Sequence, residues 1–600
     1  MKWLYLICLN ISIFTGSAQG FMSLDAIQDS VSCQFALFPQ EKIHVHTDRN
    51  MYVPGEKIWF KVYVVDAFSH QSPTFSQYAY VELINSSSLL MHRVMVSRDE
   101  FGLFHGNIFL SEIIPEGDYT LRAYTRHMEN QGDDYFFEKH IRINNLRTAE
   151  KQKEKQSSVN NDYEVSFFPE GGYLTEGVIC KVAFKALNRN GTSEIITGEI
   201  IDNEGNIITE ANTFFAGMGL FTFIPKANVN YFLICKNKSG REKRYKLPGA
   251  QKIYSITAIN RNNRIFVGIN KSPGTPEQPL YLLVHCRGVV LYDALWDHSK
   301  RFIPFSNDRL PSGIIQIVLF DGAMNPISER LIYNKNDDQA KLAFSPDKTS
   351  YQKRENVITE VYMTDPEGNP LAGHLSVAVT DDSDMETDML NTIQSTLLLS
   401  SEIKGTIESP GYYLQDNVYA AHALDLLMMT NGWRRYDISE VIKGNYMLPD
   451  VEFEVMKVIS GSVKRPFLGR SSANSEIIVF SSDGDFAQVE TDSAGFFSLY
   501  AHYPDSTKFF VQAKNQKGRP NVELILNQET FPALKHAPKS LLLSSFESQM
   551  NTQATVDASD FLKKAEQRAQ YDEDMRLIQL PEVVVSAKRI EKKDEARLSI

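Results

Sequence analysis

Short segments that alternate apolar and polar side chains recur along the chain from residue 40 onward. Many are rich in β-branched and aromatic residues, as in KIWFKVYVVDA, YAYVELI, VAFKALN, RIFVGIN and LYLLVHC. A period of two places one face of each segment in a core and the other face in solvent, which is typical of a half-buried strand. Turn dipeptides such as Pro54-Gly55 and Asp483-Gly484 separate the segments at sandwich-like spacing. The sequence therefore predicts an all-β chain of tandem β-sandwiches.

Three stretches depart from this pattern. Leu, Met and Ala recur at helical spacing over 385–399 and 417–429, and Gly432 follows the second run in the position of a C-terminal cap. Residues 554–576 combine apolar positions with alternating charges, which predicts an amphipathic helix. We therefore expect a helical insertion after the strand HLSVAVTD, a C-terminal helix, and a charged, mobile tail beyond Lys588.

The length of 600 residues predicts several domains, at about 100 to 200 residues per domain. The polar run AEKQKEKQSSVNND around 149–162 predicts an exposed linker, and weaker changes of composition near 248, 340 and 452 mark further boundaries. The predicted order is a signal peptide at 1–20, sandwiches at 40–147, 162–248, 250–338, 340–450 (with the helical insertion) and 455–530, and a helix, a strand and a tail at 531–600.

The amino terminus has secretory signal-peptide anatomy. Lys2 precedes an apolar run from Trp3 to Phe14, and small residues follow around Gly16. This run is too short to span a bilayer comfortably, and no later run of about 18 apolar residues predicts a membrane helix. We expect an exported chain with no transmembrane segment after the signal peptide.

Charge and cysteine content exclude several classes of partner and cofactor. A net charge of −12 repels phosphate backbones, so nucleic acid is excluded as a partner. The four cysteines after the signal peptide lack the close spacing of a metal cluster, and the sequence predicts no metal and no cofactor. Cys180 and Cys235 each lie in a strand-like run, where a disulfide between them is open but two free buried thiols are favoured.

The segment Glu41 to Asn145 is similar to the macroglobulin-type sandwich near the start of alpha-macroglobulins. The residues that carry this resemblance are Asp48, Arg49, Tyr52, Pro54, Gly55 and Glu56, followed by Gly102, Gly106, Pro115, Gly117 and Tyr119. The segments SFFPEGGYL with GMGLFTFIP, and LPSGIIQIVLFDGAMNPISERLIY, resemble two further sandwiches of this type. The resemblance implies immunoglobulin-like or macroglobulin-like sandwiches.

Two C-terminal segments resemble other modules. Residues 457–530 resemble the carboxypeptidase regulatory-like domain, a small non-catalytic sandwich, through Gly461, Asp492, Gly495, Phe496 and Phe497. LPEVVVSAKR at 580–589 resembles the segment leading into the plug of TonB-dependent receptors. In this order the modules resemble exported bacterial proteins associated with such plugs, which implies the periplasm or the outer-membrane periphery. The chain stops after this segment without barrel strands, so we expect no transport channel.

Catalytic motifs are missing from the sequence. None of the four cysteines precedes the Gly-Glu-Gln of a macroglobulin thioester, and neither a His-Glu-x-x-His helix, a Gly-x-Ser-x-Gly turn nor a phosphate-binding Gly-x-x-x-x-Gly-Lys loop occurs. The sequence thus predicts a protein that is not an enzyme and that does not trap proteases covalently.

Three clusters were weighed as sites. His44, His46 and Asp48 share a strand face that two imidazoles could offer to a metal, but a polar outer face is favoured. Asp382, Asp384 and Glu386 alternate like the opening of a calcium loop, but Thr387 and Ile393 replace the glycine and the glutamate that such a loop needs. NGWRRY at 431–436 could bind an anion or stack on a ligand, but Trp433 and Tyr436 as anchors of the helical insertion are favoured.

The favoured function is a non-enzymatic exported scaffold or binding protein of the diderm bacterial envelope, associated with an outer-membrane receptor or transport assembly. The alternative is a thioester-free, macroglobulin-like peptidase inhibitor or peptide-binding protein. The expected partners are envelope proteins, and no small-molecule ligand is predicted. The valine-rich run has no evident internal sheet to join, so we expect an added strand that binds a partner, formed by Leu580, Pro581, Glu582, Val583, Val584 and Val585. An ordinary edge strand folded back on the regulatory-like domain is an equally open alternative.

Overall fold

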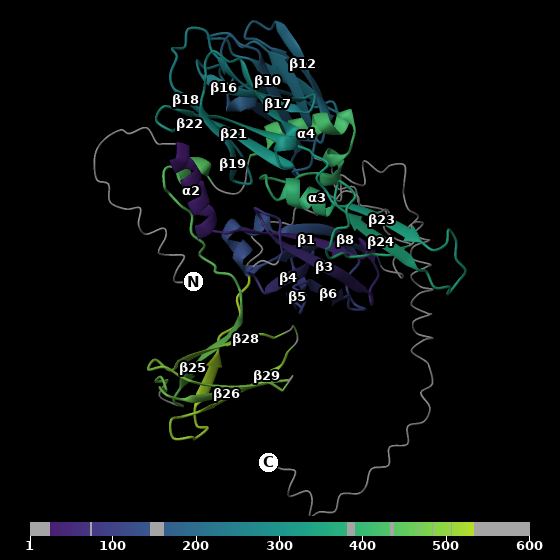
Figure 1. Ribbon diagram of the computed structural model, residues 1–600, viewed down its shortest axis with the longest axis vertical. Helices are drawn as coiled ribbons and strands as arrows, with labels where there is room; N and C mark the ends of the chain where they lie inside the picture. The colour runs from purple at the N-terminus through teal and green to yellow at the C-terminus, as the bar shows by residue number, and fades with distance from the viewer. Residues whose placement is uncertain are drawn as a thin grey trace, which may run out of the picture.

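The computed structural model describes residues 24–72, 75–144, 161–380, 391–432, 437–466, 469–482, 484–503, 505 and 507–532. Strands in several separate sheets make up most of this part of the chain, with few helices between them (Figure 1). The predicted all-β class with tandem sandwiches and a helical insertion is confirmed. The predicted signal peptide, the 554–576 helix and the segment 580–585 lie outside the described residues.

The first unit is a two-sheet sandwich. Its strands are β1 (Glu41–Thr47), β2 (Met51–Tyr52), β3 (Lys57–Asp66), β4 (Tyr78–Asn85), β5 (Leu90–Ser97), β6 (Phe104–Phe109), β7 (Gly117–Tyr124) and β8 (Phe137–Ile143). One sheet has the order β1-β3-β6 and the other β2-β8-β7-β4-β5. Alternate residues such as Ile43, Val45, Val62 and Val64 face the other sheet and are buried.

The second unit is one continuous seven-stranded sheet folded over its own core. Tyr163 and Val182 from one end of the sheet and Ile200 and Leu233 from the other join a single apolar cluster. The strand order is β15-β14-β11-β12-β13-β10-β9. The strands are β9 (Tyr163–Pro169), β10 (Cys180–Asn188), β11 (Ile196–Ile201), β12 (Ile207–Phe215), β13 (Met218–Phe223), β14 (Phe232–Asn237) and β15 (Glu242–Lys246).

The third unit is a sandwich of a three-stranded and a four-stranded sheet, ordered β16-β17-β20 and β19-β18-β21-β22. Its strands are β16 (Tyr254–Arg261), β17 (Arg264–Lys271), β18 (Leu280–Cys286), β19 (Val289–Leu295), β20 (Phe302–Ser306), β21 (Gly313–Asp321) and β22 (Pro326–Asn334). β21 is buried along almost its whole length, because the core lies on one face and helices cover the other.

Two groups of helices pack between and upon these units. The helix α4 (Val418–Thr430) begins where Asn417 accepts a hydrogen bond from the backbone of Ala420, and it fills the space between the second and third units. Its C-terminal cap is Asn431 in an extended conformation, so Gly432 is not the cap that the sequence predicted. The others are α2 (Leu24–Leu37), α3 (Ile393–Ser395), the π-helical turn η5 (Thr396–Ser400), the 3₁₀-helix η6 (Pro410–Leu414) and α5 (Ile438–Ile442).

The described part of 340–450 contains two strands, β23 (Lys341–Pro346) and β24 (Thr359–Thr364), where the sequence predicted a complete fourth sandwich. They form a hairpin that projects from the body of the molecule (Figure 1). A sandwich needs two packed sheets, and the described residues of 391–432 and 437–442 include helices that bury their apolar side chains against the other units instead.

The last described unit is a small sandwich of two three-stranded sheets, ordered β28-β25-β30 and β27-β26-β29. Val463, Ile477, Val479 and Phe497 form its core. Its strands are β25 (Lys457–Lys464), β26 (Glu476–Ser481), β27 (Phe486–Glu490), β28 (Phe496–Ala501), β29 (Phe509–Lys514) and β30 (Glu523–Leu526).

A buried ion pair joins the second and third units. Arg330 on β22 donates from Nε to Glu170 Oε1 at 3.1 Å and from Nη2 to Asp425 Oδ1 at 2.5 Å. Glu170 lies in the 3₁₀-helix η3 (Glu170–Gly172) of the second unit, and Asp425 lies on α4. Burial disfavours the charge of Arg330, but the carboxylates of Asp425 and Glu170 outweigh it and raise its pKa.

Two further buried lysines, Lys42 and Lys457, link other parts of the molecule to the first unit. Lys42 on β1 pairs with Glu402 of the helical region, and both side chains are fully buried. Lys457 of the small sandwich donates to the Tyr80 hydroxyl on β4 at 2.7 Å and pairs with Glu454. A buried charge that loses its partner is costly, so these pairs hold the units in fixed relative orientations.

Cys180 and Cys235 are free, buried thiols, as the sequence favoured. Burial raises the pKa of Cys180 to about 11 and also raises the pKa of Cys235. In the described residues no helix is both long and apolar enough to cross a membrane.

Candidate partner-docking site

The turn between β1 and β3 is a network built on three side chains. The Tyr52 hydroxyl donates to Asp48 Oδ1 at 2.7 Å, and the backbone N–H of Trp59 donates to the same oxygen at 3.0 Å. Glu56 Oε2 accepts from the backbone N–H of Val53 at 2.9 Å. Gly55 adopts a φ of 87°, a conformation in which glycine is unstrained. The Asp48, Tyr52 and Glu56 positions of the sequence resemblance are therefore structural in this turn.

The same turn occurs a second time, between β23 and β24. The Tyr351 hydroxyl donates to Asp347 Oδ1 at 2.6 Å, and the backbone N–H of Ile358 donates to that oxygen at 3.1 Å. Glu355 Oε2 accepts from the backbone N–H of Gln352 at 2.8 Å. The hydrogen bond from Tyr351 lowers the pKa of Asp347 below its ordinary value of 3.8. Asp347, Tyr351 and Glu355 thus repeat Asp48, Tyr52 and Glu56 with identical spacing.

The flanking strands repeat as well. In the first unit Ile43 pairs with Val64 and Val45 with Val62. At the corresponding positions of the hairpin Leu342 pairs with Met363 and Phe344 with Val361. Alternate residues share a face of a strand, so each hairpin presents one apolar face built from two pairs. The hairpin therefore repeats the turn and the flanking strands β1 and β3 of the first unit.

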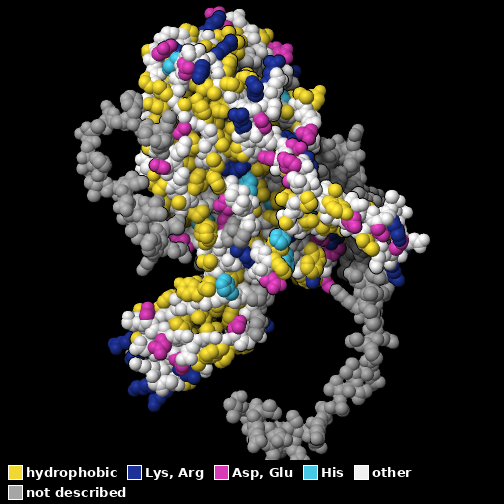
Figure 2. All heavy atoms as spheres, in the orientation of Figure 1, with side chains coloured by type: hydrophobic (Ala, Val, Ile, Leu, Met, Phe, Trp, Pro, Cys, Tyr) yellow, Lys and Arg dark blue, Asp and Glu magenta, His cyan; other side chains and the backbone are white. Residues whose placement is uncertain are grey.

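The apolar face of the β23–β24 hairpin is exposed, whereas the corresponding face of the first unit is buried. Ile43 and Val45 are 3% and 1% exposed, whereas Leu342 and Phe344 are 51% and 56% exposed. Among the described residues, β23 and β24 form a two-stranded sheet that no third strand joins, and β24 has one further bridge, from Thr364 to Pro370. We call residues 341–380 the open sandwich. Figure 2 shows hydrophobic side chains on the surface where this projection leaves the body.

The chain continues from β24 along the outer face of the first unit. Ser376 Oγ lies 2.6 Å from both His46 Nδ1 and the Tyr63 hydroxyl, and Lys61 donates to the carbonyl of Leu375 at 3.1 Å. On either side of Ser376 the apolar side chains remain in solvent, with Val377 62% exposed. A groove of about 530 Å³ follows this contact and is lined by Trp59, His105, Val377 and neighbouring residues.

The histidines of the first strand do not converge on a metal. His44 Nδ1 lies 3.0 Å from Thr396 Oγ1, and His46 contacts Ser376, while Asp48 belongs to the turn network. No group of three or more potential metal ligands occurs in the described part of the chain. Asp382, Asp384 and Glu386, and Trp433 to Tyr436, lie outside the described residues, so the calcium and anion-site hypotheses stay predictions.

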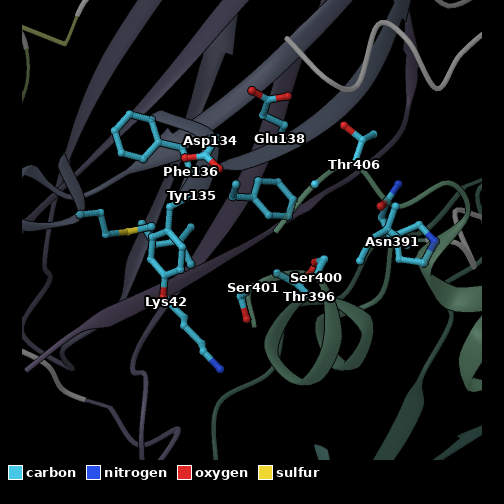
Figure 3. Close-up of a pocket in the computed structure, with 16 residues that line it drawn as sticks. Lys42, Asp134, Tyr135, Phe136, Glu138, Asn391, Thr396, Ser400, Ser401 and Thr406 are labelled. Atoms are coloured by element: carbon cyan, nitrogen blue, oxygen red, sulfur yellow. The ribbon is translucent and has the colours of Figure 1, made fainter. Parts of the chain in front are cut away.

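A second hollow, of about 110 Å³, lies between the first unit and the helical region (Figure 3). In Figure 3 Lys42 extends away from Asp134 and Glu138, toward the side where it pairs with Glu402. Thr396, Ser400, Ser401 and Thr406 line the helical side. Because both the first unit and the helical region contribute its lining, this hollow is part of the junction between the two regions.

The sequence analysis missed the open sandwich as a site. A search for the spacing Asp-x₃-Tyr-x₃-Glu would have found DKTSYQKRE at 347–355 beside DRNMYVPGE at 48–56. The Pro54-Gly55 pair that marks the first turn is replaced by Lys353-Arg354 in the second, where Arg354 takes up a φ of 66°. The segment Leu580–Val585, which was predicted as the docking strand, lies outside the described residues.

Comparison with known proteins agrees with the first unit's geometry. The family described as MG2 domain matches residues 42–138, so the chain contains a macroglobulin-like domain. No curated protein matches the chain.

Solved structures match over longer stretches but at low similarity. The Salmonella alpha-2-macroglobulin mutant Y1175G is 10% identical, with 82% of this chain and 40% of that chain covered and a TM-score of 0.15. Escherichia coli alpha-2-macroglobulin activated by porcine elastase is 11% identical, with 81% and 43% covered and a TM-score of 0.19. Dimeric latent PorU from Porphyromonas gingivalis is 12% identical, with 50% and 33% covered and a TM-score of 0.22. The chain spans less than half of each of these proteins, and the macroglobulin assignment rests on residues 42–138.

Proposed function

We propose that this chain is a non-enzymatic exported scaffold of the diderm bacterial envelope, associated with an outer-membrane receptor or transport assembly. The observation that carries the proposal is the open sandwich, an exposed apolar sheet beside units that buried ion pairs hold together. Exposed apolar surface of this kind on an otherwise packed protein is typical of a protein-binding site. The signal-peptide anatomy and the macroglobulin-like domain support export.

A second proposed binding element of this chain is the segment Leu580–Val585. Valine has high strand propensity, and Pro581 removes a backbone donor only at the start of the run. Such a segment binds by adding itself to an exposed sheet edge, so that main-chain hydrogen bonds supply affinity and alternate side chains supply specificity. The small sandwich of 457–526 is proposed to be of the carboxypeptidase regulatory-like type and to act as a spacer.

Capture from an envelope fraction tests this function. The tagged mature chain is expected to retain a defined outer-membrane receptor or transport component, identified by mass spectrometry. A chain lacking residues 577–600 is expected to lose that component with almost unchanged thermal stability, because an added strand contributes little to the packed units.

The same preparation tests the alternative function. The purified chain is expected neither to hydrolyse peptide substrates nor to form an adduct with an added protease, since the sequence has no thioester motif. Capture that is equal for the intact and the shortened chain would contradict the proposed role of 580–585. A protease adduct that survives denaturing electrophoresis would favour the peptidase-inhibitor alternative.

A further inference from the structure

The first unit shows which strands the open sandwich lacks. In the first unit β3 is followed by β4, which lies between β5 and β7 and is antiparallel to both. In the open sandwich β24 is followed by residues 374–380, HLSVAVT, at the corresponding place in the chain. Thr364 forms a bridge to Pro370, and Leu371 donates to the carbonyl of Met363 at 2.9 Å. No strand of the described residues pairs with 374–380, which leaves the positions of β5 and β7 open beside it.

Three apolar side chains of this segment are exposed and would lie beside those of an added strand. Leu375, Val377 and Val379 are 38%, 62% and 91% exposed, whereas Ser376 contacts the first unit. In an extended conformation these three side chains would share one face and form one apolar row, because alternate residues of a strand point to the same side. An extended segment with an apolar row and an open edge is a template for strand addition.

The sequence contains one segment suited to this position. The described residues after 391 are committed to the helices between the units and to the small sandwich. The remaining sequence from 533 to 600 contains one run of three consecutive β-branched apolar residues, Val583 to Val585. Val583 and Val585 would share a face opposite to that of Val584, which matches the apolar row of 374–380.

We propose that residues 580–586 add to residues 374–380 of the same molecule as an antiparallel strand. This inference rests on the proposed role of Leu580–Val585 as an added strand, and it names the acceptor that this strand occupies while no envelope partner is bound. Lys588 and Arg589 end the apolar run, so the added strand is limited to the length of the exposed row.

The tether between the two segments favours the intramolecular contact. Phe531 is held against the first unit by Arg93, whose guanidinium carbon lies 3.7 Å from the ring centroid. The same unit contacts the open sandwich through Ser376. Residues 533–579 span up to roughly 150 Å when extended, at about 3.3 Å per residue. A tether that reaches the site supplies an effective concentration well above that of a second molecule in dilute solution.

Photo-crosslinking in the purified full chain tests the contact. The photoreactive residue p-benzoylphenylalanine replaces Val379, whose side chain is 91% exposed. Irradiation is expected to join position 379 to a peptide that contains residues 580–586, in a product with the mass of a monomer. The double variant V583D/V585D is expected to lose this product, and V584D is expected to retain it, because Val584 would face away from the apolar row.

A peptide measurement provides a second readout. A fluorescent peptide of residues 577–589 is expected to bind V583D/V585D, in which the acceptor is vacated, and to bind the unsubstituted chain at least about tenfold more weakly. Failure of the peptide to bind V583D/V585D would overturn the proposal, as would a crosslink to any other segment. A crosslinked dimer would overturn the intramolecular assignment. None of these results depends on envelope partners, so capture from an envelope fraction can fail while this contact is present.

Discussion

Replacing Arg330 by alanine is expected to lower the free energy of unfolding by about 3–5 kcal/mol, which is the usual cost of leaving one member of a buried ion pair alone. The Arg330 side chain is 2% exposed and the Glu170 side chain 6% exposed, so water cannot replace the lost guanidinium. Lys181 Nζ lies 3.6 Å from the other carboxylate oxygen of Glu170 and compensates only in part. Urea unfolding measures this change, in the transition in which the unit that contains β22 unfolds.

A matched surface pair serves as the control for this prediction. Lys341 and Asp337 form an ion pair at 3.3 Å with side chains 51% and 83% exposed, so Lys341→Ala is expected to change the free energy of unfolding by less than about 0.5 kcal/mol. The change in the free energy of unfolding for Arg330→Lys is expected to lie between those for Arg330→Ala and Lys341→Ala. A lysine keeps the charge but cannot donate to two carboxylates in the fork geometry of arginine. A change below about 0.5 kcal/mol for Arg330→Ala would show that the junction does not hold the second and third units together.

The second prediction compares equivalent residues of the first unit and of the open sandwich. Ile43→Ala is expected to destabilise the first unit by about 2–5 kcal/mol, because Ile43 is 3% exposed and its removal leaves a cavity. Leu342→Ala, at the corresponding position of the open sandwich, is expected to cost less than about 1 kcal/mol, since Leu342 is 51% exposed. Thermal and urea unfolding of both variants check the contrast. Equal costs would mean that a second layer covers the open sandwich.

The first unit could be predicted because its determinants are local. Asp48, Tyr52 and Glu56 form the turn within nine residues, and buried residues alternate with more exposed ones along most of β3. The helix α4 was predicted for the same reason, since Asn417 caps it and its apolar residues follow the helical period. The predicted C-terminal cap of α4, Gly432, was wrong, because the chain leaves the helix in an extended conformation at Asn431 and needs no glycine there.

The open sandwich shows what local patterns leave undetermined. The alternation in HLSVAVTD predicted a strand, but residues 374–380 form none, whereas TEVYMT, which the sequence analysis did not single out, forms β24. Whether such strands gain a second sheet depends on segments far away in the sequence, and no local pattern states which segments these are. The helix α2 was missed because it follows directly on the apolar amino terminus, and its burial against α5 and β19 becomes visible only in three dimensions.

Hydrogen–deuterium exchange of the backbone amides in residues 371–380 tests most directly whether this segment accepts a strand. The unsubstituted chain is expected to exchange these amides about tenfold more slowly than V583D/V585D, because an added strand would hold them in hydrogen bonds. The amides of β3, which pair with β1 and β6 in both chains, are expected to exchange at equal rates and serve as the internal reference. Equal exchange of 371–380 in the two chains would contradict the proposal that the open sandwich is a site of strand addition.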